Sequence, residues 1–213
     1  PGLTTNMPGA FVLGSVGRPF PGVEIQIAED GEILAKGPNI TAGYLNRPEA
    51  TEEAFAKDGW FHTGDLGSKD DRGFIKITGR KKELIKTSGG KYVAPTKIEG
   101  KLKSLPIIQE VVVIGDRRNY CVCVISLDPE ELAAWSEQQG VSADLQGEPV
   151  KQAIQAKIDE VNGGLASFES LKYFRVLPEP MTVENGILTA SLKVKRKVVE
   201  DRYADLIEEM YTK

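Results

Sequence analysis

The sequence predicts an α+β protein, because strand patterns dominate its first part and helix and strand patterns mix in the rest. Up to residue 79, short runs of alternating apolar and polar residues are separated by glycine-containing turns, which is typical of antiparallel strands. After Arg80 the pattern changes, and several stretches repeat apolar residues at helical spacing with strand-like runs between them. Helices mixed with antiparallel strands over about 130 residues have the size of an ordinary domain.

The first part contains a predicted hairpin, a short helix and a further strand. Glu29-Asp30-Gly31 is a hairpin turn signal between two alternating runs. Pro48 suits the first turn of a helix, where its missing N–H costs nothing. A turn at residues 70–73 leads into the last run. The predicted elements are strands over Val23–Ala28, Glu32–Lys36 and Phe74–Thr78 and a helix over Pro48–Ala56.

The second part begins with a glycine-tipped hairpin, in which Ser88-Gly89-Gly90 joins strands over 84–86 and 91–93. Pro95 then opens a helix. Glu99, on this helix, is expected to be a carboxylate that stabilises the domain. The apolar stripe of the helix consists of Ile98, Leu102 and Leu105.

An apolar hairpin, two helices, a strand and a final helix are predicted for the remaining residues. Asp128 is an N-cap followed by a proline and two glutamates, and Gly140 ends that helix. Apolar residues from Val150 to Val161 recur at three- or four-residue spacing, which predicts the next helix. The expected strands are Gln109–Gly115, Tyr120–Leu127 and Tyr173–Leu177, and the final helix has the apolar residues Val194, Val198, Leu206 and Met210.

Composition narrows the classes of function. The net charge is only −4, so no overall basic field points to nucleic acid, although residues 80–86 and 193–197 are basic. Cys121 and Cys123 lie on one face of a predicted strand and are too close in sequence for a sound disulfide. We expect both to be reduced core residues of a cytoplasmic protein. No apolar run approaches the roughly 20 residues of a membrane span, so membrane contact would be peripheral at most, at the inner face.

Two runs of residues carry the chemistry. Gly59-Trp60-Phe61-His62-Thr63-Gly64-Asp65-Leu66-Gly67 sets a carboxylate on a glycine-flanked turn, where Asp65 can accept hydrogen bonds from the two vicinal hydroxyls of a ribose. Gly79-Arg80-Lys81-Lys82-Glu83-Leu84-Ile85-Lys86 then supplies fixed positive charge suited to a nucleotide. Taken alone, Asp65 also fits a turn residue that bonds its own backbone, and Arg80 fits a solvated charge. His62 has no nucleophile motif beside it and receives no catalytic role.

Together these runs resemble the adenylate-forming enzymes, the superfamily of acyl-CoA synthetases, luciferases and peptide-synthetase adenylation domains. The resemblance implies that residues 1–79 are the C-terminal end of a large AMP-binding domain and complete its small β-barrel. It also implies that residues 80–82 are a hinge and that residues 83–213 form a small mobile α+β domain. Three shorter motifs fall in the family's order, namely Gly17-Arg18-Pro19-Phe20-Pro21-Gly22, Gly31-Glu32-Ile33 and Gly43-Tyr44-Leu45.

The resemblance implies roles for single residues as well. Asp65 and Arg80 would bind the ribose hydroxyls of the adenylate, and Lys82 would be the hinge residue between the two domains. Lys86 and the hairpin tip would enter the active site during thioester formation, where glycine lets a narrow thiol-bearing arm pass close to the backbone. The tip residues are Ser88, Gly89 and Gly90.

A lysine near the C-terminus is the last candidate. By resemblance, Lys193 would bind the carboxylate and α-phosphate oxygens and stabilise the charge that develops as pyrophosphate leaves. Many relatives have glycine just before this lysine, whereas Leu192 stands here, so Lys195 and Lys197 are alternatives. The sequence of residues 184–196 resembles the corresponding region of long-chain fatty acyl-CoA synthetases.

The function implied by the resemblance is activation of a long-chain fatty acid in two half-reactions. Fatty acid and ATP give acyl-AMP and pyrophosphate, and the thiol of coenzyme A then displaces AMP. The phosphate-binding loop and the Mg²⁺ ligand are expected upstream of Pro1, in a missing N-terminal domain of the same polypeptide. The chain is therefore expected to be a C-terminal fragment that is inactive alone and holds no metal, with fatty acid, ATP and coenzyme A as partners and no nucleic acid. Two alternatives are another adenylate-forming ligase, such as a carrier-protein acyl-AMP ligase, and a non-catalytic binding or regulatory module.

Overall fold

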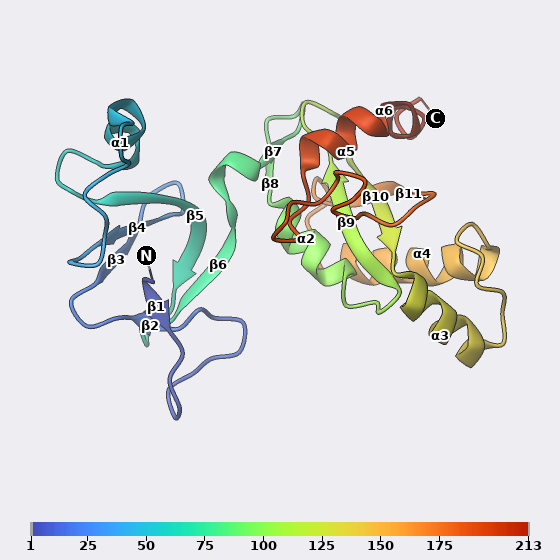
Figure 1. Ribbon diagram of the computed structural model, residues 1–213, viewed down its shortest axis with the longest axis horizontal. Helices are drawn as coiled ribbons and strands as arrows, with labels where there is room; N and C mark the ends of the chain where they lie inside the picture. The colour runs from blue at the N-terminus through green and yellow to red at the C-terminus, as the bar shows by residue number, and fades with distance from the viewer. Residues whose placement is uncertain (1, 213) are drawn as a thin grey trace. The chain divides into compact units, whose positions relative to one another are not determined.

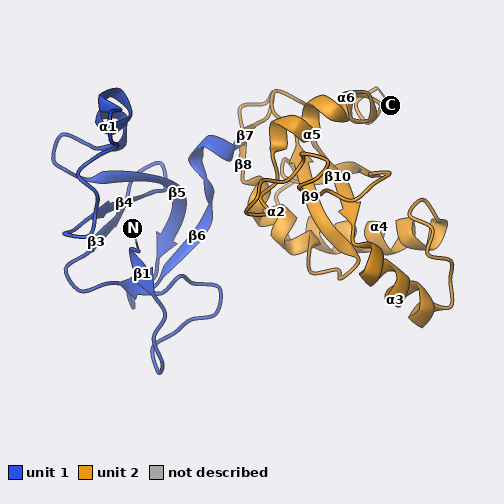
Figure 2. Cartoon of the chain, viewed as in Figure 1, with its two compact units in different colours: residues 1–84 blue, residues 85–213 orange. Residues whose placement is uncertain are grey.

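The computed structural model describes residues 2–212, and the chain divides into two compact units between Leu84 and Ile85 (Figure 1, Figure 2). Unit 1 precedes this point and is rich in strands, whereas unit 2 follows it and mixes helices with strands. The predicted α+β class is therefore confirmed. In the described part of the chain, no helix is long and apolar enough to cross a membrane.

Unit 1 is built around an antiparallel sheet with the strand order β3-β4-β5-β6. The predicted hairpin, the short helix and the strand after residue 73 are confirmed. The strands of the sheet are β3 (Glu24–Ile27), β4 (Glu32–Lys36), β5 (Phe61–Lys69) and β6 (Ile75–Arg80). The other elements are β1 (Thr4–Thr5), β2 (Arg18–Pro19), α1 (Pro48–Ala54) and the 3-10 turn η1 (Lys81–Glu83). The buried core includes Val23, Ile25, Ile33 and Ile75.

Strand β5 corrects the prediction that Asp65 lies on a turn. Asp65 instead lies within a β-strand, Phe61–Lys69, which pairs with both β4 and β6. Because glycine and aspartate are depleted in strands, the run around Gly64 and Gly67 has the composition of a loop. Outside Gly64 and Asp65, pairing on both edges supplies hydrogen-bond partners for the backbone of β5, and this tertiary context overrides the local preference.

Unit 2 contains a second sheet, with the strand order β11-β10-β9. Strands β9 (Ile108–Ile114) and β10 (Cys121–Leu127) form the predicted antiparallel hairpin, whereas β11 (Leu171–Val176) runs parallel to β10. The prediction of antiparallel strands is thus wrong for β11. Helices α3 (Pro129–Gln139) and α4 (Glu148–Asn162) lie between β10 and β11 in the chain, and a crossover of this length allows a strand to return in the parallel direction.

Both faces of this sheet are covered. Alternate side chains of β9 and β10 join a buried cluster with helices α2 (Pro95–Leu102) and α4, and the intervening side chains join a second cluster with the C-terminal segment. Cys121 and Cys123 are free and buried in the first cluster, as predicted. Burial raises the pKa of the Cys121 thiol to about 11, which keeps this thiol protonated at neutral pH.

The predicted helix signals hold in unit 2, except near the C-terminus. Asp128 caps α3 by accepting hydrogen bonds from the backbone N–H groups of the two following glutamates, and Gly140 ends the helix in the left-handed conformation. The predicted final helix is instead two short helices, α5 (Arg196–Arg202) and α6 (Ala204–Glu208), which are separated at Tyr203.

Glu99 stabilises unit 2, as the sequence predicts. The residue is 8% exposed, and its carboxylate accepts a hydrogen bond from the Val113 N–H at 2.8 Å. The same carboxylate pairs with Arg196 at the start of α5. Glu99 therefore links α2 with β9 and with the C-terminal segment, and its burial is compensated by these partners.

Candidate functional site

The first candidate residues, Asp65 and Arg80, lie opposite each other on β5 and β6. The register of the two strands pairs them directly, and Arg80 Nε lies 2.9 Å from Asp65 Oδ1. The Asp65 side chain is 26% exposed and the Arg80 side chain is 59% exposed, so a ligand can reach both. The structure thus brings together the carboxylate and the guanidinium that the sequence motifs single out.

A bulge in β5 fixes the backbone just before Asp65. The pairing register between β4 and β5 shifts at this point, so β5 carries more residues than the strand beside it. Gly64 has a φ of +72°, a left-handed conformation that glycine adopts without strain. The Asp65 N–H donates to Thr63 Oγ1 at 3.1 Å, and that hydroxyl donates to the Ile33 carbonyl at 2.6 Å. These contacts set the direction in which the Asp65 side chain leaves the strand.

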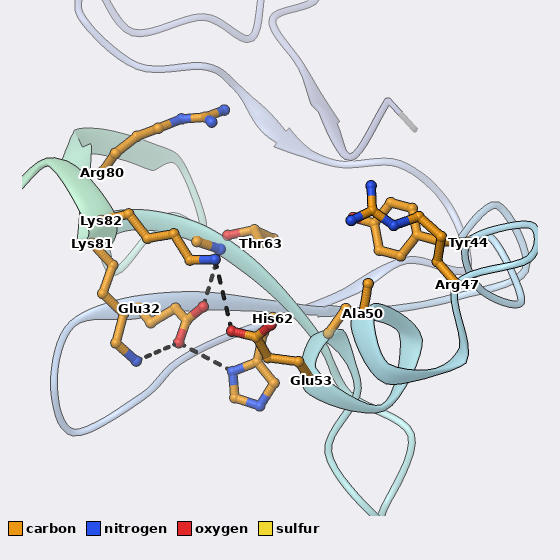
Figure 3. A pocket seen from close by; sticks show the side chains of 12 residues that line it. Glu32, Tyr44, Arg47, Ala50, Glu53, His62, Thr63, Arg80, Lys81 and Lys82 are labelled. Atoms are coloured by element: carbon orange, nitrogen blue, oxygen red, sulfur yellow. Dashed lines mark hydrogen bonds and ion pairs between the residues drawn. The ribbon is translucent and has the colours of Figure 1, made fainter. Parts of the chain in front are cut away.

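Glu32 is a candidate site residue to which the sequence analysis gave no role. It is 3% exposed, and its carboxylate accepts hydrogen bonds from the Gly64 N–H at 3.0 Å and from Lys81 Nζ at 2.8 Å. His62 Nδ1 lies 3.1 Å from the same carboxylate, and Figure 3 shows Glu32 between Lys81 and the His62 ring. Burial alone would raise the pKa of Glu32, but the hydrogen bonds from Lys81, His62 and Gly64 outweigh burial and hold the pKa below its ordinary value.

Lys81 and Lys82 are held very differently. Lys81 Nζ also lies 2.7 Å from Asp30 Oδ2, so it contacts two carboxylates at once. The hydrogen bonds to Asp30 and Glu32 raise the pKa of Lys81 above its ordinary value. The Lys82 side chain is 88% exposed, and its Nζ lies 3.7 Å from one oxygen of Glu53, whose side chain is also exposed. Lys81 is therefore anchored, whereas Lys82 is held only by a weak surface contact.

A pocket of about 760 Å³ opens beside these residues within unit 1 (Figure 3). Four cations and two carboxylates line it, so the wall carries net positive charge. Arg80 belongs to the lining, whereas Asp65 lies just outside it. The charged residues of the wall are Glu32, Arg47, Glu53, Arg80, Lys81 and Lys82. Such a pocket suits an anionic ligand that reaches the Asp65–Arg80 pair from its arginine side.

Lys86 and the glycine tip lie in unit 2, on the hairpin of β7 (Ile85–Lys86) and β8 (Tyr92–Val93), which confirms the predicted hairpin. The turn between β9 and β10 supports the tip. The Ser88 N–H donates to the Arg118 carbonyl at 2.9 Å, and Ser88 Oγ donates to Asn119 Oδ1 at 2.7 Å. The exposed candidates on this hairpin are Lys86, Ser88, Gly89 and Gly90.

Lys193 lies in unit 2, in a tight turn that follows β11 in the chain. Leu192 precedes it with a φ of +58°, a conformation that costs a non-glycine residue about 1–2 kcal/mol. The two alternative lysines have partners, because Lys195 Nζ donates to a backbone carbonyl at 3.1 Å and Lys197 Nζ lies 2.8 Å from Asp201. Lys193 is exposed, and its side chain contacts no hydrogen-bond or ion-pair partner among residues 2–212.

The candidate residues fall into two groups. Asp65, Arg80 and Lys82 belong to unit 1, and Lys86, the hairpin tip and Lys193 belong to unit 2. Within residues 2–212, no cluster of three or more histidine, cysteine or carboxylate side chains could hold a metal ion.

Comparison with known proteins reveals relatives over nearly the whole chain. Residues 82–213 match the family model of the AMP-binding enzyme C-terminal domain. Long-chain-fatty-acid–CoA ligase FadD15 of Mycobacterium tuberculosis is 44% identical over 207 residues, covering 94% of this chain and 34% of that protein. Long-chain-fatty-acid–CoA ligase 5 of Rattus norvegicus is 38% identical over 228 residues, covering 99% of this chain and 33% of that protein. The chain thus spans about a third of the length of these relatives.

Solved adenylation domains share the fold. The adenylation domain of a carboxylate reductase from Mycobacterium chelonae superposes with a TM-score of 0.74 and 27% identity, covering 94% of this chain and 32% of that one. The corresponding domain of a carboxylic acid reductase from Segniliparus rugosus, solved with AMP and a co-purified carboxylic acid, gives a TM-score of 0.73 and 29% identity, covering 92% of this chain and 32% of that one. Coverage of this extent includes residues of both units.

Proposed function

This chain belongs to the family of AMP-binding enzymes, and we propose on that premise that it is the C-terminal part of an AMP-forming ligase for long-chain fatty acids. In the proposed reaction, fatty acid and ATP give acyl-AMP and pyrophosphate, and the thiol of coenzyme A then displaces AMP. The ligases that are 44% and 38% identical support this substrate class. An N-terminal domain of the same polypeptide would supply the acyl pocket, the phosphate loop and the Mg²⁺ ligand, in a cytoplasmic enzyme.

The observation that carries the proposal is the ion pair of Asp65 and Arg80, 2.9 Å apart on neighbouring strands. Each hydroxyl of a ribose can donate one hydrogen bond and accept others. The Asp65 carboxylate can therefore accept from both vicinal hydroxyls, while the guanidinium of Arg80 donates to their oxygens. Charge-assisted hydrogen bonds of this kind are stronger than those between neutral groups, so the pair is suited to select a nucleotide with an intact ribose.

We assign pyrophosphate departure to Lys193 rather than to Lys195 or Lys197. Both alternatives already contact other groups of unit 2, whereas the Lys193 ammonium is open to a ligand. The left-handed backbone of Leu192 supports this register, because glycine, which many relatives have at this place, adopts that conformation readily. A preorganised cation would stabilise the charge that develops on the α-phosphate and carboxylate oxygens.

We assign thioester formation to Lys86 and the hairpin tip, and the change between the two half-reactions to a hinge at residues 80–82. The exposure of Ser88, Gly89 and Gly90 leaves room for a thiol-bearing arm. Lys82 suits a hinge because its side chain is 88% exposed and makes one long ion pair. In this proposal residues 1–79 belong to the large domain and residues 83–213 to the mobile one.

A ligase that loads a carrier protein is the second candidate function. The solved adenylation domains of carboxylic acid reductases favour it, since one of them, 29% identical, was solved as an A-PCP didomain with AMP. The two functions differ in the thiol that receives the acyl group. A fatty acyl-CoA ligase should release acyl-CoA when coenzyme A is added to its acyl-AMP, whereas a carrier-protein ligase should leave coenzyme A unacylated and acylate the phosphopantetheine of a carrier protein.

We expect the 213-residue chain by itself to give no fatty-acid-dependent exchange of pyrophosphate into ATP, because we place the phosphate-binding loop in the N-terminal domain of the complete enzyme. The glycine-rich run before Lys91, Ser88-Gly89-Gly90, belongs to the hairpin that we assign to thioester formation. The complete enzyme should catalyse this exchange. Radioactive pyrophosphate measures it with and without fatty acid. Exchange by the isolated chain above the rate without fatty acid would show that the phosphate site lies within these residues.

A further inference from the structure

The buried carboxylate of Glu32 contacts the residues on either side of the Asp65–Arg80 pair. Gly64 immediately precedes Asp65, and Lys81 immediately follows Arg80, and both donate to Glu32. We propose that Glu32 is a positioning residue that holds Asp65 and Arg80 in register for a nucleotide ribose. This inference rests on the proposed function, since it assigns to Glu32 the geometry of the pair that binds the ribose.

The first contact fixes Asp65. A bulge interrupts the regular ladder of hydrogen bonds, and a bulge residue needs another acceptor for its N–H. Glu32 supplies that acceptor from the neighbouring strand, with its Oε1 3.0 Å from the Gly64 nitrogen. Because Gly64 has no side chain to lock its own conformation, the hydrogen bond to Glu32 restricts the peptide that leads into Asp65.

The second contact fixes Arg80. Lys81 Nζ lies 2.8 Å from Glu32 Oε2, so the residue that follows Arg80 is tied to β4. The next residue, Lys82, is 88% exposed and has no comparable anchor. The boundary between anchored and free backbone therefore falls between Lys81 and Lys82. A change of backbone angle at Lys82 can then occur while Arg80 remains beside Asp65.

Glu32→Gln tests this role, because an amide keeps the shape of the side chain but can accept at only one of its two positions. If the NH₂ group of the glutamine faces Gly64, the Gly64 N–H loses its acceptor. If the NH₂ group faces Lys81 and His62, it places a donor against the Lys81 ammonium. We expect AMP binding to the complete enzyme to weaken about tenfold, the loss of roughly one charge-assisted hydrogen bond. Asp30→Asn is the matched control, because Asp30 contacts the same Lys81 at an exposed position and its amide oxygen can still accept from the Glu32 N–H. This variant should change AMP binding less than about twofold.

Two measurements on the 213-residue chain need no ligand. Hydrogen exchange at the Gly64 amide should be about tenfold faster in Glu32→Gln and unchanged in Asp30→Asn, with strand β10 of unit 2 as an internal reference. His62 is the only histidine in the sequence, so its ring gives a single set of ¹⁵N signals. These signals should shift in Glu32→Gln, which removes the carboxylate beside Nδ1, and should stay in place in Asp30→Asn.

The outcomes separate this inference from the proposed function. If Asp65→Ala leaves AMP binding unchanged, the proposed function fails. If Asp65→Ala weakens binding but Glu32→Gln behaves like Asp30→Asn, only the role of Glu32 is overturned. Should Glu32→Gln unfold unit 1, Lys81→Met replaces it, since this variant keeps the contacts of Glu32 to Gly64 and His62. Lys81→Met should weaken AMP binding at least about threefold, and unchanged binding would likewise overturn the inference.

Discussion

Replacing Asp65 by alanine in the complete enzyme is expected to weaken the binding of ATP and AMP by about one to three orders of magnitude. The carboxylate would accept from two ribose hydroxyls, and each such charge-assisted contact contributes about 1.5–3 kcal/mol. Isothermal titration with AMP measures the loss directly. The melting temperature should change little, because the ion pair with Arg80 lies at the surface and such pairs contribute little to stability.

Asp65→Asn is the matched control for this change. It keeps the shape of the side chain and one acceptor oxygen, so it should fold as the unchanged protein does and still bind AMP more weakly. A structural role would give the opposite pattern. If Asp65→Ala lowers the melting temperature and leaves the affinity for ATP and AMP unchanged, Asp65 only supports the strand, and its assignment to the ribose is wrong.

Lys193→Ala is expected to slow the formation of acyl-AMP by about 10²- to 10³-fold, the usual cost of removing one preorganised charge from a transition state. Thioester formation from supplied acyl-AMP should stay nearly unchanged, because the lysine would act only while pyrophosphate leaves. The two rates are measured separately, by pyrophosphate exchange and by release of acyl-CoA from synthetic acyl-AMP. Lys197→Ala is the control, since Lys197 already pairs with Asp201.

Variants of the hairpin should give the reverse result. Lys86→Ala should slow thioester formation and spare the first half-reaction. Gly89→Trp should do the same by obstruction, because a Cβ at Gly89 meets no other atom and a large side chain there would fill the space that a thiol-bearing arm needs. If the Lys193 and Lys86 variants both slow the same half-reaction, the assignment of one lysine to each half-reaction is wrong.

Most of the secondary structure could be predicted because its patterns are local. The apolar runs of β9 and β10, the three- and four-residue spacing along α4 and the cap at Asp128 each depend on neighbours in the sequence. Strand β5 could not be predicted this way, because its extended conformation comes from pairing on both edges. The parallel direction of β11 likewise depends on the path of the chain through α3 and α4.

The candidate site shows the same division. Asp65 and Arg80 could be found from their motifs, and the strand register then places them side by side. Glu32 belongs to the motif Gly31-Glu32-Ile33, but its hydrogen-bond partners Gly64 and Lys81 are far away in the sequence. On an alternating strand a carboxylate has the pattern of a solvated residue, so only the bulge in β5 and the turn after β6 show that Glu32 is buried and shared.

Whether Asp65 binds the ribose is decided by a cycle of one protein change and one ligand change. The affinities of AMP and of its 2′-deoxy and 3′-deoxy analogues are measured for the complete enzyme and for Asp65→Ala. With Asp65 present, loss of a hydroxyl should weaken binding about tenfold. With alanine, the same loss should cost less, because the hydroxyl no longer has its carboxylate acceptor and keeps only its contact with Arg80. An equal loss in both enzymes would show that the hydroxyls bind elsewhere.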